Sequence, residues 1–181
     1  MIESIISNNC TGGAVMHELG MEFKTPTINL QILPEQYPRF CKYLKYYLAI
    51  NMRECTEISD KHEKYLTKMF GGVPDMPLGI LDDVVVCFQH YPTFEEGKSK
   101  WDERKAKINY DHIGYIFHVR GPEYKNEAEA FLRLPLDNKL LLTQDFSVKG
   151  SIGFEGEGFS VVNDKLLITQ IYDYKTWREN G

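Results

Sequence analysis

The alternation of strand-like and helix-like segments constrains the fold of this chain more than any other feature of its sequence. Four segments have the short apolar or β-branched runs of buried strands: residues 2–6, 81–88, 113–117 and 139–143. A helix expected over 93–109 opens with Thr93 and Glu96, whose spacing matches a capping box. A shorter helix is expected over 125–133, before the last of these strands. Strands that alternate with helices predict crossover connections and a parallel sheet.

The rest of the chain adds flanking helices and a different C-terminal segment. A helix of about 37–48 follows from the apolar spacing of Tyr37, Phe40, Cys41, Leu44 and Leu48. Short helices are expected over 13–19 and 63–70, and a strand or extended link over 27–33. After residue 149, turns at 155–158 and 163–164 predict short antiparallel strands.

These elements predict one α/β domain over residues 1–181, with a core over 1–149 and a C-terminal hairpin and tail over 150–181. We expect three layers: a mainly parallel, Rossmann-like sheet flanked by helices, with a short antiparallel C-terminal addition. The tail could cover the site or mediate self-association, so a homo-oligomer is one of the possible states of the protein.

Composition disfavours several classes of partner. The chain carries 21 Lys and Arg against 26 Asp and Glu, for a net charge of −5, which disfavours a nucleic-acid-binding surface. Its four cysteines contain no CxxC pair, which argues against a structural zinc site and a disulfide framework. No apolar run approaches the ~20 residues of a membrane span, and the apolar N-terminus is too short for a signal peptide. We therefore expect a cytoplasmic protein without membrane insertion.

Polar residues follow the ends of all four predicted strands. The first strand ends in Ser7, Asn8, Asn9 and Cys10, and the 81–88 strand in Gln89, His90 and Tyr91. His118 and Arg120 follow the third strand, and Gln144 and Asp145 follow the fourth. Because ligands bind outside the carboxyl ends of the strands in open α/β sheets, these clusters predict one composite site. The alternative is that strands commonly give way to polar turns.

The loop over residues 7–13 is the sharpest single feature. Asn8 and Asn9 can donate amide hydrogen bonds, and Gly12 and Gly13 let backbone N–H groups approach an anion at a helix start. Together they predict an oxyanion hole or a phosphate cradle. The alternative is a tight turn capped by asparagine. The loop matches neither the Walker A nor the GxGxxG pattern.

Three residues are candidates for catalysis. Cys10 is a candidate nucleophile that a helix N-terminus could activate, although a small buried thiol is the competing interpretation. Ser7 is the alternative nucleophile. His90 is the candidate general base, against the interpretation of an ordinary surface histidine.

Trp101 and Arg104 lie on the apolar stripe of the 93–109 helix. A guanidinium on that stripe needs an anionic partner, either Asp111 or another acid of the chain, or else an anionic ligand. Trp101 could stack on a sugar or base, or belong to the core.

No metal site or cofactor is expected. The chain has no Asp-x-Asp motif, Asp82-Asp83 lies at the start of a strand, and His112 and His118 have no third ligand nearby.

Three stretches carry a resemblance to a known family: Ser-Asn-Asn-Cys-Thr-Gly-Gly over residues 7–13, Gln-His-Tyr over 89–91, and Trp101 with Arg104-Lys105. Over residues 2–145 the chain resembles the bacterial family called domain of unknown function nineteen-nineteen. Members are often labelled exopolysaccharide or capsule biosynthesis proteins, which implies a context of surface polysaccharide assembly. The chain departs from the family after the 113–117 strand. Similar proteins tend to carry an aspartate-bearing turn there, and this one has His118-Val119-Arg120.

Combined with the predicted site, this context leads to three hypotheses. The first is a transferase that binds an acyl- or phospho-linked donor, acyl-CoA or a nucleotide sugar, at the 7–13 loop and modifies a glycan acceptor. His90 would be its base, and Arg104 would hold an anionic group. The second is a non-catalytic regulator that binds a nucleotide sugar or glycan. The third is a metal-independent glycosyltransferase.

Overall fold

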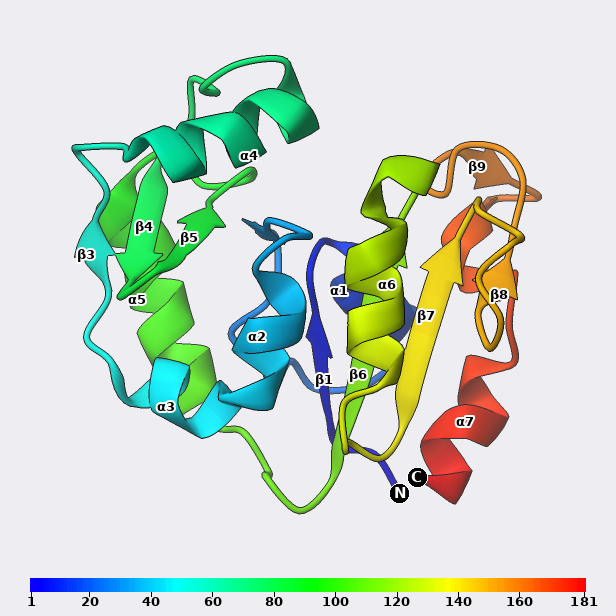
Figure 1. Cartoon of the computed structure of the whole chain (residues 1–181). Coiled ribbons are helices and arrows are strands. Elements are labelled where there is room, and N and C mark those ends of the chain that lie inside the picture. Colours follow the sequence, from blue (N-terminus) through cyan, green and yellow to red (C-terminus); the bar gives the residue numbers. More distant parts are fainter.

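The computed structural model describes residues 1–181, and its larger architectural unit is a parallel sheet flanked by helices (Figure 1). The strand order is β1-β6-β7-β8, and every neighbouring pair is parallel. The four strands are β1 (Ser4–Ser7), β6 (Ile113–Val119), β7 (Lys139–Thr143) and β8 (Ile152–Gly153). The predicted α/β class with a parallel sheet is therefore confirmed.

Helices cover both faces of this sheet, which gives three layers. Ile5 and Ile116 point to the face covered by α1 (Thr11–Glu18) and α7 (Tyr174–Asn180). Ile6 and Phe117, one residue further along each strand, point to the opposite face. That face is covered by α2 (Tyr37–Lys42) and α6 (Lys125–Leu132). Since side chains alternate along a strand, strands with both faces covered consist of continuous apolar runs, as these do.

A second four-stranded sheet is entirely antiparallel, with the order β2-β5-β4-β3. Its strands are β2 (Gln31–Ile32), β5 (Val84–Cys87), β4 (Leu78–Leu81) and β3 (Arg53–Glu54). The prediction of one strand over 81–88 within the parallel sheet is therefore wrong. Leu81 ends β4, Asp82 turns the chain with a φ of 56°, and β5 returns beside β4.

The apolar run that suggested a parallel strand has a different cause. Val84 and Val86 face the larger core, while Val85 and Cys87 face a smaller cluster. The strand is thus buried on both faces inside an antiparallel hairpin. Burial, not strand direction, produced the continuous apolar sequence.

Most predicted helices are present, with altered bounds. The 37–48 helix breaks at Tyr43 into α2 and α3 (Leu44–Ala49). The chain also forms α4 (Asp60–Phe70) and α5 (Phe94–Lys105), and α1 begins before the predicted residue 13. The Thr93 side chain accepts a hydrogen bond from Glu96 N at the start of α5, as its capping pattern indicates.

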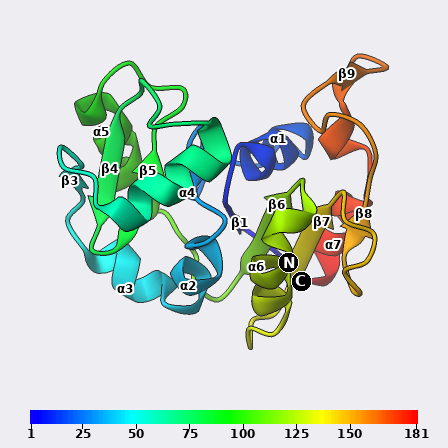
Figure 2. The ribbon, with the colours of Figure 1, turned by 45° about the horizontal axis from the view of Figure 1, so that its top comes forward.

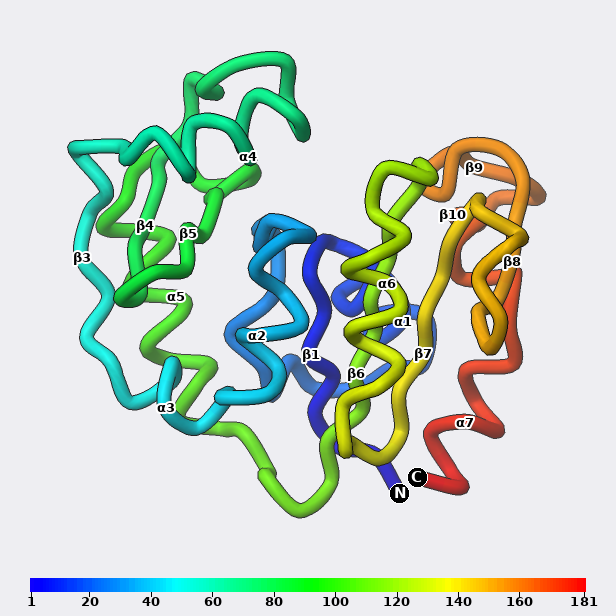
Figure 3. Tube along the Cα trace, viewed as in Figure 1, coloured from blue at the N-terminus to red at the C-terminus, as the bar shows by residue number.

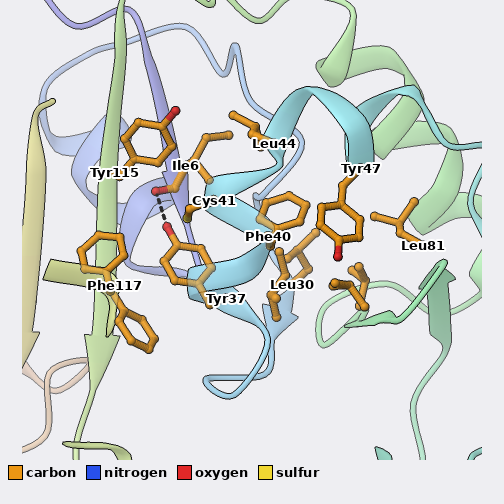
Figure 4. Close-up of a cluster of buried hydrophobic side chains, with 14 of the residues drawn as sticks. Ile6, Leu30, Tyr37, Phe40, Cys41, Leu44, Tyr47, Leu81, Tyr115 and Phe117 are labelled. Carbon is orange, nitrogen blue, oxygen red and sulfur yellow. Dashed lines mark hydrogen bonds between the residues drawn. The ribbon is translucent and has the colours of Figure 1, made fainter. Parts of the chain in front are cut away.

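The larger core joins the two sheets. It contains residues of β1 and β6 together with residues of β4, β5 and α5, and α2 lies between the sheets (Figure 3). The ring of Tyr37 packs 5.0 Å from that of Phe117, and its hydroxyl lies 2.9 Å from the carbonyl oxygen of Ile6 (Figure 4). The two sheets are therefore fixed relative to each other by buried side chains.

The C-terminal segment is only partly as expected. β9 (Val161–Val162) and β10 (Lys165–Leu166) form an antiparallel hairpin that stands away from the parallel sheet (Figure 2). Its turn, Asn163-Asp164, has positive φ at both residues, as a tight hairpin requires. The strand added to the sheet edge, β8, is parallel instead of antiparallel. The chain also contains two single 3₁₀ turns, at Pro122–Tyr124 and Leu167–Thr169.

The chain ends in α7, which the sequence patterns did not predict. It returns to the start of the chain, where Ile2 N donates to Arg178 O at 2.8 Å. None of the helices is long and apolar enough to cross a membrane.

Candidate functional site

A cavity of about 600 Å³ lies at the carboxyl ends of β1 and β6. Its walls include residues from three of the four predicted polar clusters: Asn9, Cys10, Gln89, His90, His118 and Arg120. The fourth cluster lies elsewhere. Gln144 Nε2 donates to Gly156 O, and Asp145 accepts a hydrogen bond from Ser147 N. The strand ends therefore form a composite site from three clusters instead of four.

The antiparallel sheet is connected to this site by its strand β2, which hydrogen-bonds to the residue after β1. None of its strands pairs with the parallel sheet as a neighbouring parallel strand. Ile32 N of β2 donates to Asn8 O at 2.7 Å, directly after β1. Because β5 pairs with β2, the residues after β5 arrive beside the loop between β1 and α1. Gln89 and His90 thus reach the cavity from a strand that is not in the parallel sheet.

Asn8 and Asn9 shape the loop that follows β1. The Asn8 side chain is fully buried and forms two bonds with the His118 backbone: Oδ1 accepts from N at 2.9 Å, and Nδ2 donates to O at 3.0 Å. Asn9 Oδ1 accepts from Thr11 N at 3.0 Å, an Asx turn that starts α1. Only Asn9 lines the cavity. The loop is therefore the asparagine-capped turn of the alternative interpretation, and the Asn8 side chain joins the end of β1 to β6.

The two glycines of the loop serve helix packing. A Cβ atom at Gly12 would lie 2.7 Å from Ser7 Cβ, and one at Gly13 would lie 3.4 Å from Ile28 Cδ1. Neither glycine lines the cavity. The structure therefore does not place the predicted phosphate cradle at these two residues.

We expect Gly12→Ala to lower the free energy of unfolding by about 1 to 3 kcal/mol, because the added methyl overpacks the contact between α1 and β1. A loss of stability would be the opposite of the usual effect, since alanine in a helix ordinarily stabilises a protein by about 1 kcal/mol relative to glycine. Urea denaturation measures the change. Gly72→Ala is the matched control, since nothing lies within 4 Å of a Cβ there. A Gly12→Ala protein as stable as the wild type would contradict this packing role.

The two predicted nucleophiles are poorly placed for attack. Ser7 is completely buried, and its hydroxyl accepts a hydrogen bond from Asn9 N. Cys10 occupies the N-cap position of α1, and its Sγ lies 4.0 Å from Gln89 Oε1. Burial raises the pKa of the Cys10 thiol. A raised pKa disfavours the thiolate and supports the competing interpretation of a partly buried thiol over an activated nucleophile.

His90 has the accessibility that a general base requires. Its side chain is exposed, lines the cavity and forms no hydrogen bond within the chain. Gln89 beside it is half-buried and also lines the cavity. The base assignment stays a prediction, with a position that fits it.

Tyr91, Trp101 and Arg104 lie outside the cavity. Arg104 Nη1 donates to the Tyr91 hydroxyl at 2.8 Å, and the guanidinium lies 5.9 Å from the centroid of the Phe23 ring. Its partner within the chain is a phenol, and it forms no ion pair with Asp111 or any other carboxylate. Trp101 is 1% exposed and belongs to the larger core, so the stacking role predicted for it is wrong.

His118 is more prominent than its sequence position suggested. Its Nδ1 lies 2.8 Å from Thr11 Oγ1, and its Nε2 is buried without a hydrogen-bond partner. Burial, with Arg120 as a further cause, lowers the pKa of His118 to about 3. The imidazole is therefore neutral at physiological pH.

Lys68, from α4, also lines the cavity and was not predicted. Its ammonium lies 3.0 Å from Glu35 Oε1 and 4.1 Å from the centroid of the Tyr124 ring. No sequence signal could have found it, because these partners lie 33 and 56 residues away along the chain.

The cavity is less acidic than the chain as a whole. Arg120 is exposed and forms no ion pair, and Lys68 adds a second cation, while Glu123 is the one carboxylate in the wall. No group of three or more His, Cys, Asp or Glu side chains is arranged to hold a metal ion.

A second cavity of about 680 Å³ lies on the outer side of α2 and α3, where Arg39, Tyr43 and Tyr46 line it. It contains none of the predicted site residues. The cavity at the strand ends is therefore the candidate functional site.

Two comparisons with known proteins show what the chain is similar to. An uncharacterized protein of Haemophilus influenzae (strain ATCC 51907 / DSM 11121 / KW20 / Rd) is 23% identical over 174 residues, which are 96% of this chain and 76% of that protein. The model of the family described as "Domain of unknown function (DUF1919)" matches residues 2–178. The chain therefore belongs to the DUF1919 family.

Proposed function

We propose that this protein is a transferase of bacterial surface polysaccharide biosynthesis. It takes a diphosphate-bearing donor into the cavity at the ends of β1 and β6 and transfers a group to a glycan hydroxyl. Acyl-CoA and nucleotide sugars both carry a diphosphate, so this chemistry covers both kinds of donor. The observation that carries the proposal is that one cavity is lined both by the Arg120 guanidinium, which forms no ion pair, and by the exposed imidazole of His90.

Arg120 is suited to the donor end of this reaction. A guanidinium presents several N–H donors in a fixed plane that matches phosphate oxygens. That of Arg120 is exposed and forms no ion pair with the chain. Lys68 adds positive charge, although its ammonium already lies beside Glu35. A diphosphate would therefore contact Arg120 directly.

Two amide side chains of the cavity wall suit a sugar acceptor. Amides of Asn9 and Gln89 can both donate and accept hydrogen bonds, as hydroxyl groups do. As the acceptor oxygen bonds to the acyl or anomeric carbon of the donor, its proton passes to His90. The electron pair of the broken bond leaves with the coenzyme A thiolate or the nucleoside diphosphate.

Ligand binding tests the donor class first. Thermal unfolding is measured with acetyl-CoA, UDP-glucose, UDP and inorganic pyrophosphate. A donor at 100 times its dissociation constant adds about 2.7 kcal/mol of stability. We expect Arg120→Ala to raise the dissociation constant of the donor substrate roughly 10- to 100-fold, the effect of one charge-assisted hydrogen bond. Arg53→Ala, an exposed arginine on β3, is the control. Absence of stabilisation by all four compounds would overturn the proposal.

Turnover tests the role of His90. With the donor identified, we expect His90→Ala to lower turnover about 100-fold and to leave donor affinity unchanged, because a base contributes to the transition state. His17→Ala, another exposed histidine, serves as the control. Unchanged turnover in His90→Ala removes the base assignment. Donor binding without turnover in the wild type favours the non-catalytic, ligand-binding regulator.

A further inference from the structure

The contact between Thr11 and His118 determines which imidazole nitrogen carries the proton. Both side chains are buried, and Thr11 Oγ1 lies 2.8 Å from His118 Nδ1. A buried hydroxyl proton needs an acceptor, and the Thr11 hydroxyl has no partner other than Nδ1. With Thr11 as donor, only Nε2–H lacks a partner, whereas with Nδ1 as donor both the Thr11 hydroxyl proton and the Nε2 lone pair would lack one, so the arrangement with Thr11 as donor is favoured. Since a neutral imidazole has one proton, that proton lies on Nε2.

The surroundings of the ring keep it neutral. Its centroid lies 5.3 Å from that of Phe154 and 5.8 Å from that of Phe159, so two apolar rings replace water around it. The nearby charged group is the cation Arg120, just after β6, and His118 forms no ion pair with a carboxylate. Both conditions disfavour a second proton and lower the pKa of His118. The Nε2–H group is thus a fixed, uncharged donor.

The Nε2–H group has no hydrogen-bond acceptor within the chain. Nε2 is buried and unpartnered, and His118 is one of the residues that line the cavity. Gly158 packs on the same ring: a Cβ atom there would lie 3.1 Å from Cε1 and 3.6 Å from Nε2. The C-terminal segment therefore presents no side chain at residue 158 that could accept the proton. An unsatisfied buried N–H is unfavourable, so an acceptor that enters the cavity would be favoured.

The adjacent groups indicate which acceptor would fit. Arg120 follows the end of β6, two residues after His118, and both residues line the cavity. Thr11 is the first residue of α1, whose N-terminus carries partial positive charge. Phosphate oxygens accept hydrogen bonds and carry negative charge, which suits all three features.

We infer that His118 binds the diphosphate-bearing substrate: its Nε2–H group donates a hydrogen bond to a phosphate oxygen. Thr11 is the positioning residue that holds the imidazole in this tautomer. The inference rests on the proposed function for its ligand. It adds a neutral contact beside the ionic contact of Arg120. The two contacts together distinguish a bound diphosphate from an anion held at the surface by charge alone.

Nuclear magnetic resonance tests the tautomer without any ligand. In protein labelled with ¹⁵N-histidine, long-range ¹H–¹⁵N correlations report which ring nitrogen is protonated. We expect His118 to be protonated at Nε2 only at pH 7, and Thr11→Val to populate both tautomers. A proton on Nδ1 in the wild type would overturn the inference and leave the proposed transferase untouched.

Calorimetric titration with inorganic pyrophosphate tests the contact. We expect His118→Asn and Thr11→Val to raise the dissociation constant roughly 10-fold, the effect of one hydrogen bond to a charged group. Thr11→Ser, which keeps the hydroxyl, should bind within about 3-fold of the wild type. His118→Gln, whose longer amide reaches the Nε2 position, should retain more affinity than His118→Asn. His17→Gln is the control.

The variants separate the two possible failures. If Arg120→Ala weakens pyrophosphate binding while His118→Asn and Thr11→Val bind like the wild type, His118 does not contact the ligand and the inference fails alone. If wild-type protein binds neither pyrophosphate nor any of the donors, the diphosphate is not the ligand and both proposals fail.

Discussion

Trp101→Ala is expected to lower the free energy of unfolding by about 3 to 5 kcal/mol, the effect of removing a large aromatic side chain from a core. Trp101 is 1% exposed, and its ring centroid lies 6.4 Å from that of Phe40. It therefore joins α5 to α2 within the core that connects the two sheets. Urea denaturation followed by circular dichroism measures the change.

Two further variants make the result specific. Phe146→Ala removes an aromatic side chain that is 65% exposed and should change stability by less than about 1 kcal/mol. Trp101→Phe keeps most of the buried volume and removes an indole N–H that has no partner, so it should destabilise less than alanine. A Trp101→Ala protein that is fully stable but loses ligand binding would restore the stacking role that the sequence suggested.

The stability of the protein is expected to fall below pH 6.5 because of His118. The pKa of this imidazole is about 3 in the folded chain and close to its ordinary 6.5 in the unfolded chain. Above pH 6.5 both states are neutral at this residue, so it adds no pH dependence. Between pH 6.5 and 3 the unfolded chain binds a proton that the folded chain excludes, which destabilises the fold by about 1.4 kcal/mol per pH unit.

A variant without the imidazole isolates this contribution. Wild type and His118→Gln are unfolded with urea at pH 7.5 and pH 4. We expect the loss of stability on acidification to be larger in the wild type by about 3 kcal/mol. The comparison cancels the carboxylates and the other four histidines, which both proteins share. Equal losses in the two proteins would show that His118 takes up a proton in the folded state.

Residues close together in the sequence determined much of the fold. The apolar runs of β1, β6 and β7 predicted a parallel sheet, the Thr93 and Glu96 spacing predicted the start of α5, and Asn163-Asp164 predicted a hairpin turn. Cap and turn chemistry act over a few residues, and apolar periodicity reports burial wherever it occurs. The same local logic placed polar residues at strand ends, and two of the clusters that line the cavity follow β1 and β6 as expected, while the third follows β5 of the antiparallel sheet.

Only the tertiary structure decided how these segments meet. The run that contains β5 is buried on both faces, and this pattern is the same in a parallel sheet and in the hairpin that the chain forms. The partners of Arg104 and the burial of Trp101 and Cys10 depend on residues far away in the sequence. His118 is the clearest case. Its hydrogen-bond partner Thr11 and the rings of Phe154 and Phe159 that pack on it come from both ends of the chain, and the fold brings them to β6. Desolvation and hydrogen bonding are set by contacts in space, which a one-dimensional pattern does not contain.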